Sequence, residues 1–163
     1  MKVEIDQSGK IEETNKNTVL AFSNGKHGVV LIRSKTKRQL LEMFRRIGKP
    51  KLFIYRTFTA GIFLLVEPYI TSLSTIAIDT EWLGKDRLIS DIFSEFVQKR
   101  KVLHKPNITF CFVGKNSPVH ILAWITYKSL VQKKPLKRKI RTLSMEKLAS
   151  LALKKSPQKT TEV

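Results

Sequence analysis

The feature that most constrains the fold is an Asn-Gly pair, at positions 24 and 25, between two short runs of apolar and β-branched residues. The runs cover 18–23 and 28–33, and Asn-Gly in this position is the strongest short-range signal for a β-hairpin. A third run with period-two alternation, 3–6, precedes them and ends in turn residues. We therefore predict an antiparallel meander of three strands at the start of the chain.

The rest of the chain alternates between helical and strand-like patterns. Apolar residues recur every three or four positions in 35–47 and again in 51–70, which predicts two helices, with a strand over 51–56 as the alternative for the second. Two buried-type strands follow, each with a helix after it: 75–79, 88–100, 107–113 and 117–130. This order predicts an α/β fold with a mixed five-stranded sheet and helices on both faces.

The boundaries of the helices carry recognisable signals. Ser34 can cap the first long helix, and Ser117-Pro118 is a preferred start for the helix that follows the last strand. Beyond residue 130 we predict a basic arm over 133–141 and a short helix capped by Ser144. The chain would then divide into a domain over 1–130 and a C-terminal arm over 131–163.

The charge of the chain points to a polyanionic partner. Lys and Arg number 31 against 13 Asp and Glu, which gives a net charge of +18, and most of the excess follows residue 96. Nucleic acid is the expected partner, ahead of an anionic membrane surface. The chain has a single cysteine, Cys111, so it cannot form a disulfide framework or a thiolate metal cluster. This cysteine lies in an apolar run.

Neither a signal peptide nor a membrane span is expected from the pattern. The first six residues alternate charged and apolar side chains, and the most apolar window, 57–66, is about half the roughly 20 residues that cross a bilayer. We expect a cytoplasmic protein without a membrane partner, in which 57–66 is a buried helix.

Two aspartates end strands with nearly the same local sequence. Asp6 ends Val-Glu-Ile-Asp and Asp79 ends Ile-Ala-Ile-Asp. If these strands are parallel neighbours, about 4.8 Å apart, the two carboxylates converge and repel unless a cation such as Mg²⁺ neutralises them. Glu81 would point the same way and offer a third oxygen ligand. The alternative is that each aspartate only caps a turn.

One histidine has a chemical context. His120 is the third residue of the helix that opens at Ser117-Pro118, where unpaired N–H groups and the helix dipole disfavour a charged imidazole. A neutral imidazole can bind a metal or move a proton. The alternative is an ordinary surface residue.

From Val3 to Leu130 the chain resembles the ribonuclease H-like superfamily, which includes ribonucleases H and RuvC-type resolvases. The likeness is carried by the order of elements and by three short motifs: Asp6-Gln7-Ser8-Gly9, Asp79 at the end of the fourth strand, and His120-Ile121-Leu122-Ala123. It implies bound Mg²⁺ or Mn²⁺ and the hydrolysis of phosphodiesters. It also implies that Asp6 and Asp79 are metal ligands and that His120 is a ligand or a general acid/base.

The chain departs from ribonucleases H at one acid. Those enzymes carry a Glu early in the first long helix, whereas residues 35–38 here are Lys-Thr-Lys-Arg. Glu81 is our preferred substitute, both as a catalytic residue and as a metal ligand. Glu42, further along the same helix, and Glu67 are the alternatives.

Cations on the first long helix and near the C-terminal arm are expected to bind phosphates. Two tryptophans, Trp82 and Trp124, could stack on bases, although core packing is our expectation for Trp124. The sequence thus favours a metal-dependent nuclease acting on structured RNA, an RNA–DNA hybrid or branched DNA. The alternative is a non-catalytic RNA-binding protein, for example a ribosome-associated one, on the same fold. The expected nucleic-acid-binding residues are Lys35, Lys37, Arg38, Arg45, Arg46, Lys115, Lys133, Lys134, Lys137, Arg138, Lys139 and Arg141.

Overall fold

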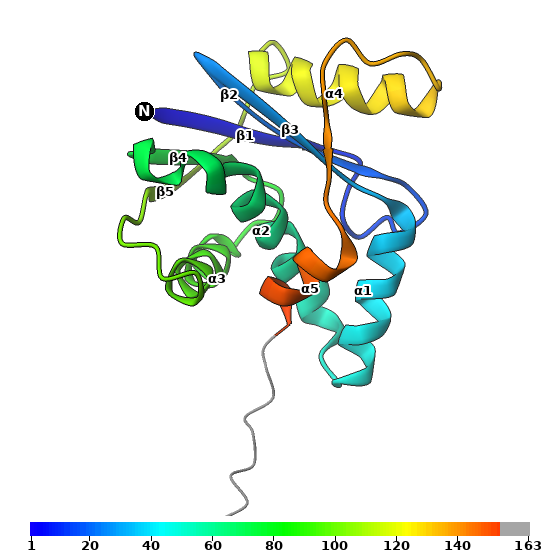
Figure 1. Ribbon diagram of the computed structural model, residues 1–163, viewed down its shortest axis with the longest axis vertical. Coiled ribbons are helices and arrows are strands. Elements are labelled where there is room, and N and C mark those ends of the chain that lie inside the picture. The colour runs from blue at the N-terminus through cyan, green and yellow to red at the C-terminus, as the bar shows by residue number, and fades with distance from the viewer. Residues whose placement is uncertain (154–163) are drawn as a thin grey trace, which may run out of the picture.

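A computed structural model describes residues 1–153 and shows a mixed six-stranded sheet in the order β5-β4-β1-β2-β3-β6 (Figure 1). The first three strands pair antiparallel, and the pairs β1–β4, β4–β5 and β3–β6 are parallel. The α/β class and the N-terminal meander are therefore confirmed. The strands are β1 Lys2–Ser8, β2 Thr18–Asn24, β3 Lys26–Ile32, β4 Thr75–Asp79, β5 Asn107–Cys111 and β6 Arg141–Thr142.

The sixth strand corrects the expected number of five. Residues 141 and 142, at the end of the predicted arm, pair with Val30 and Leu31 at the open edge of β3. An exposed edge presents unpaired backbone groups, and even a two-residue strand satisfies some of them. The basic arm therefore returns to the sheet.

The helices agree closely with the sequence pattern, and the strand considered over 51–56 is wrong. Short 3₁₀ turns, Pro50–Leu52 and Glu67–Ser72, flank the second helix. The helices are α1 Ser34–Arg46, α2 Phe53–Val66, α3 Asp86–Lys99, α4 Pro118–Val131 and α5 Met145–Ala152. No helix in residues 1–153 has the length and apolar character needed to cross a membrane.

The sheet separates two layers of helices (Figure 1). Along β2, Val19 and Ala21 face α4, where they pack with Val119 and Ala123. Their neighbours Leu20 and Phe22 belong to the larger core, which includes α1, α2, α3 and α5. Side chains alternate between the faces of a strand, so β2 contributes to both cores. The expectation of helices on both faces is confirmed.

Helix α2 is the buried centre of the larger layer. All residues from 56 to 66 are buried, as the apolar window 57–66 predicted. At Gly61 a Cβ atom would lie 2.5 Å from Cδ1 of Leu20, so only glycine lets α2 approach β2 this closely. A helix surrounded in this way is apolar on all sides, which explains its sequence.

Of the three serine caps, only Ser144 acts through its side chain, which accepts the Lys147 N–H. Ser34 is instead the first residue of α1, and its N–H donates to Oδ1 of Asn17, 2.9 Å away. Ser117 is the N-cap of α4, but its hydroxyl donates to Glu4. Helix α5 shares the larger core, and the remainder of the predicted arm, 154–163, lies outside the described residues.

Candidate metal centre

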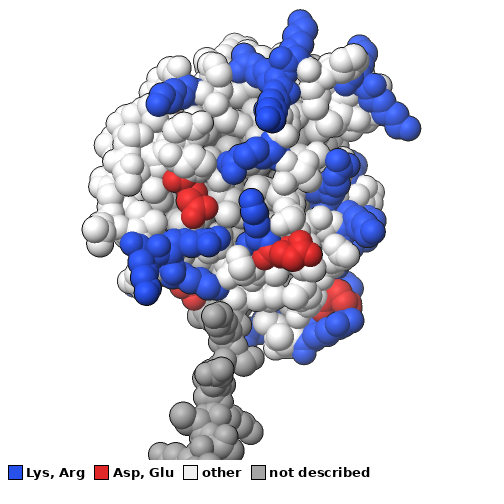
Figure 2. All heavy atoms as spheres, viewed as in Figure 1, with Lys and Arg blue, Asp and Glu red and all other residues white. Residues whose placement is uncertain are grey.

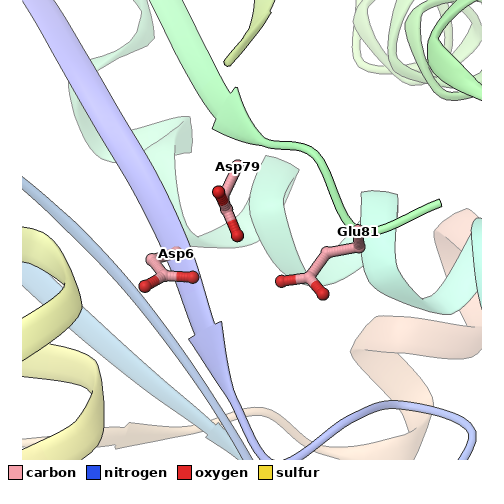
Figure 3. Close-up of side chains that lie close together, drawn as sticks. All are labelled: Asp6, Asp79 and Glu81. Carbon is pink, nitrogen blue, oxygen red and sulfur yellow. The ribbon is translucent and has the colours of Figure 1, made fainter. Parts of the chain in front are cut away.

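The parallel pairing of β1 and β4 brings Asp6 and Asp79 together. Only Asp79 ends its strand, because β1 continues through Gln7 to Ser8, so the expectation that Asp6 also ends a strand is wrong. Ile5 pairs with Ile78, and Asp6 and Asp79 are the next residue of each strand. Ligand oxygens of Asp6, Asp79 and Glu81 all lie within 4.8 Å of one another (Figure 3). The predicted convergence is therefore confirmed, and Glu81 points back to the aspartates from the segment after β4.

Glu81 is held in place by its neighbour in the chain. The Trp82 ring packs edge-to-face against Tyr55 and Phe58 of α2, with centroid distances of 5.5 and 4.9 Å. This aromatic contact anchors the segment between β4 and α3 on the larger core. This contact helps to hold the backbone at Glu81 close to Asp6 and Asp79.

Asp6 is almost fully buried, with 4% of its surface exposed. Its Oδ1 accepts the N–H of Gln7 at 2.8 Å, and its Oδ2 lies 2.7 Å from Nδ1 of His120. Burial raises the pKa of this carboxyl, the hydrogen bond from His120 opposes that rise, and the negative charge of Asp79 adds to it. An additional positive charge beside Asp6 would favour its ionised form.

Asp79 is oriented by the next strand. Its Oδ1 accepts the N–H of Val113 at 2.7 Å, two residues beyond the end of β5. The carboxylate therefore uses one oxygen to hold the β5 end. Because the other oxygen is not needed for this bond, Asp79 keeps ligand capacity toward Asp6 and Glu81.

Glu81 has a strongly perturbed carboxyl. Its pKa is raised to about 7, first by burial and then by the charges of Asp79 and Asp6, while the nearby Gln7 amide lowers it. Gln7 is only 8% exposed, and neither its Nε2 nor its Oε1 reaches a partner with hydrogen-bond geometry among the described residues. A buried amide without a partner is costly, and a ligand at this cluster would satisfy it.

The donor set fits a hard divalent cation. Three carboxylates converge, two of them with raised pKa values, and oxygen ligands of this kind suit Mg²⁺ and Mn²⁺. His120 is not a member of this mutually close set and instead contacts Asp6 through Nδ1. It can therefore act on the cluster through Asp6.

The other two candidate acids lie elsewhere. Glu42 pairs with Arg45 and Arg46 of its own helix, and Glu67 pairs with Arg100. Neither belongs to the group of close carboxylates in the described residues. Among the three acids considered for the missing position, only Glu81 joins Asp6 and Asp79.

The expectation that Lys37 binds phosphate is wrong. Lys37 is 0% exposed, and its ammonium donates to the carbonyl oxygens of Lys10 and Glu13 and to the Thr18 hydroxyl. Such an amine holds the β1–β2 connection together and is not accessible to a ligand. Arg141 is also engaged, because its guanidinium donates to the carbonyl oxygens of Leu64 and Leu65.

The remaining expected cations are exposed, namely Lys35, Arg38, Arg45, Arg46, Lys115, Lys133, Lys134, Lys137, Arg138 and Lys139. Figure 2 shows one face of the molecule, on which Lys and Arg predominate. The upper part of that face, over α4 and the segment after it, carries cations without an acid. A polyanion could lie along this surface.

Comparison with known proteins gives no match: no family model, curated protein or solved structure is significantly similar to this chain.

Proposed function

We propose that this protein is a metal-dependent nuclease whose Mg²⁺ or Mn²⁺ is held by Asp6, Asp79 and Glu81. The observation that carries the proposal is the convergence of three carboxylates from two parallel strands and the segment after β4. The order of elements and the change from antiparallel to parallel pairing support the resemblance to the ribonuclease H-like superfamily. The exposed cations support a nucleic-acid substrate.

Each group has a distinct task in this proposal. When bound, the cation polarises the phosphoryl group and lowers the pKa of water. Asp6, Asp79 and Glu81 bind it, and the Gln7 amide provides a donor or acceptor beside Glu81. The hydrogen bond from His120 favours the ionised form of Asp6, and the second ring nitrogen can accept or donate a proton.

The test is cleavage of end-labelled substrates: duplex RNA, an RNA–DNA hybrid, single strands and a branched DNA. The wild-type protein is expected to cut at least one of them with Mg²⁺ or Mn²⁺ and none with a chelator. Asp6→Asn, Asp79→Asn and Glu81→Gln should abolish cutting. Glu42→Gln is the matched control, because Glu42 lies on α1 outside the cluster. Cutting that survives Asp6→Asn and Asp79→Asn would overturn the proposal.

A second candidate is a non-catalytic RNA-binding protein on this fold. The start of α1 favours it, because this segment has no acid and exposes the cations Lys35 and Arg38. RNA binding that is tight, unaffected by chelator and unchanged in Asp6→Asn, together with no cutting of any substrate, would support this function over the first.

A further inference from the structure

Helix α4 carries a histidine, a tryptophan and a lysine that lie one turn apart and could contact a nucleic-acid strand. His120, Trp124 and Lys128 are spaced at four-residue intervals, so they lie along one side of the helix, with about 6 Å of rise between successive members. His120 contacts Asp6 of the carboxylate cluster. The stripe His120–Trp124–Lys128 therefore leads away from the candidate metal centre along the surface.

Trp124 is exposed, which overturns the expectation that it packs in the core. The buried side of α4 is formed by Val119, Ala123 and Thr126, and 48% of Trp124 remains accessible. The Lys128 ammonium lies 4.6 Å from the centroid of the Trp124 ring, within the range of a cation–π contact. A large, half-exposed aromatic ring therefore carries a cation over its face.

The charge around this ring favours a polyanionic occupant. Helix α4 contains no acidic residue, and none of the ion pairs among residues 1–153 includes Lys128. Exposed Lys133 and Lys134 follow the helix. A second copy of a chain with net charge +18 would be repelled from this surface, whereas a nucleic-acid strand would be attracted.

We propose that Trp124 is a stacking platform for an unpaired base next to the phosphate that a divalent cation held by Asp6, Asp79 and Glu81 would bind, and that Lys128 neutralises a neighbouring phosphate. The turn between His120 and Trp124 is comparable to one nucleotide step of an extended strand. Stacking on a side chain requires a base whose face is free, which a continuous duplex does not offer. The substrate class of the proposed nuclease is therefore nucleic acid that is unpaired beside the cleaved bond: a loop, a splayed arm or a branch point.

This inference rests on the proposed function for its link to cleavage, but its test does not require turnover. In a Trp82→Phe background, Trp124 is the only tryptophan, and its fluorescence reports stacking directly. With chelator present, a thymine 12-mer is expected to quench this emission and a blunt duplex of equal length to leave it nearly unchanged. Circular dichroism of the background variant checks that it is folded.

A binding titration with fluorescein-labelled strands gives the energetic readout. Trp124→Leu should weaken binding of the single strand by about 5- to 150-fold, the range expected for loss of one base–aromatic stack, and binding of the duplex by less than about twofold. Ile125→Ala is the matched control, since Ile125 is an equally exposed apolar residue on the same helix. It should bind both probes as the wild type does.

The inference is overturned by an absence of quenching by the single strand, by an equal loss of affinity for single strand and duplex in Trp124→Leu, or by quenching by an acidic amphipathic peptide instead of by nucleic acid. Cleavage with Mn²⁺ separates this inference from the proposed function. Single-strand binding that depends on Trp124 without any cleavage would refute the nuclease and leave the platform. Cleavage that does not depend on Trp124 or on unpaired bases would refute the platform alone.

Discussion

Nδ1 of His120 lies 2.7 Å from Oδ2 of Asp6, so the third residue of α4 contacts a β1 residue 114 positions earlier in the chain. An ionised carboxylate only accepts hydrogen bonds, so Nδ1 is the donor while Asp6 is charged. The second ring nitrogen, Nε2, is then left for proton transfer, and 32% of the His120 side chain is exposed. The contact opposes the effect of burial on Asp6 and fixes the imidazole ring.

Replacing His120 by Ala is expected to lower the single-turnover cleavage rate by about 10²- to 10⁴-fold, the usual contribution of a positioned acid or base. Manganese binding should weaken much less, because the three carboxylates remain. His27→Ala is the control, since His27 lies exposed in the β2–β3 hairpin. Equal losses in cleavage and manganese affinity would indicate that His120 acts on the metal site itself.

Metal binding should depend on pH through Glu81. Its pKa of about 7 means that binding at pH 6 must displace close to one proton, whereas binding at pH 8 displaces few. Calorimetry of Mn²⁺ binding in buffers of different ionisation enthalpy measures this number. In Glu81→Gln the proton release should fall sharply and the affinity should vary less between pH 6 and 8. Unchanged release in that variant would assign the proton to another group.

The same carboxyl affects stability in the absence of metal. A raised pKa means that the folded state holds a proton more tightly than the unfolded state, so the contribution is complete below about pH 4.5 and lost as the pH rises through 7. The melting temperature of the wild type in chelator should therefore fall relative to that of Glu81→Gln between pH 5 and 8. Added Mn²⁺ should reverse the difference.

Lys37→Met is expected to destabilise the fold by about 1–3 kcal/mol, because three acceptors, of which the Thr18 hydroxyl is buried, lose their donor. Burial lowers the pKa of Lys37 to about 8, so the folded state binds fewer protons than the unfolded state between about pH 8 and 10.5. Stability should rise with pH in that window for the wild type more than for the variant. Urea unfolding at pH 8 and 10 measures both effects, with Lys35→Met, an exposed residue of α1, as control.

Arg56→Met should loosen α5. The Arg56 guanidinium lies 2.7 Å from the Glu95 carboxylate and also donates to the Ala152 carbonyl. We expect a loss of about 2–3 kcal/mol, less than for a fully buried pair because 35% of the Glu95 side chain is exposed. Urea unfolding measures the total loss of stability. Faster amide exchange at Leu148 and Leu151 would show that the loss is concentrated in α5. Arg87→Met, which removes an exposed pair, should cost under about 0.5 kcal/mol.

The exposed cations after α4 should set the salt dependence of nucleic-acid binding. For each of Lys133→Gln and Lys134→Gln, the slope of log K against log salt should decrease by about 0.7 to 0.9 if the residue contacts a phosphate. The variants should weaken single-strand and duplex binding alike, in contrast to Trp124→Leu. Fluorescence anisotropy between 50 and 300 mM KCl, as an approximate range, measures the slopes. Unchanged slopes would indicate that nucleic acid binds at another surface of the protein.

The sequence was informative where a local pattern reports a long-range arrangement. Val-Glu-Ile-Asp and Ile-Ala-Ile-Asp have the same apolar register, and parallel strands in this register place their two aspartates side by side, although β1 runs on to Ser8. Ser117-Pro118 located the start of α4 and hence His120 at its third position. In these cases short-range sequence signals and the geometry of paired strands are enough to predict which residues come together.

The structure added what depends on packing between distant segments. Lys37 precedes Leu40 and Phe44 by three and seven positions, so it lies on the buried side of α1. The spacing alone indicated burial, but a lysine is normally expected to be exposed. Gln7 looked like a turn residue, and only the position of Glu81 shows that its amide faces the carboxylates. Trp124 is exposed where core packing was expected, and Trp82, whose setting was left open, packs against the larger core. Their neighbours, and not their own types, decide their exposure.

The distance in the chain between Asp6, Asp79 and His120 has a consequence for biosynthesis. The residues arrive at the ribosomal exit in that order, and the histidine that holds Asp6 follows it by 114 positions. A nascent chain arrested before α4 would carry an aspartate pair without its imidazole and a sheet with one uncovered face. The complete arrangement around Asp6 therefore forms only after α4 has been made and has packed on the sheet.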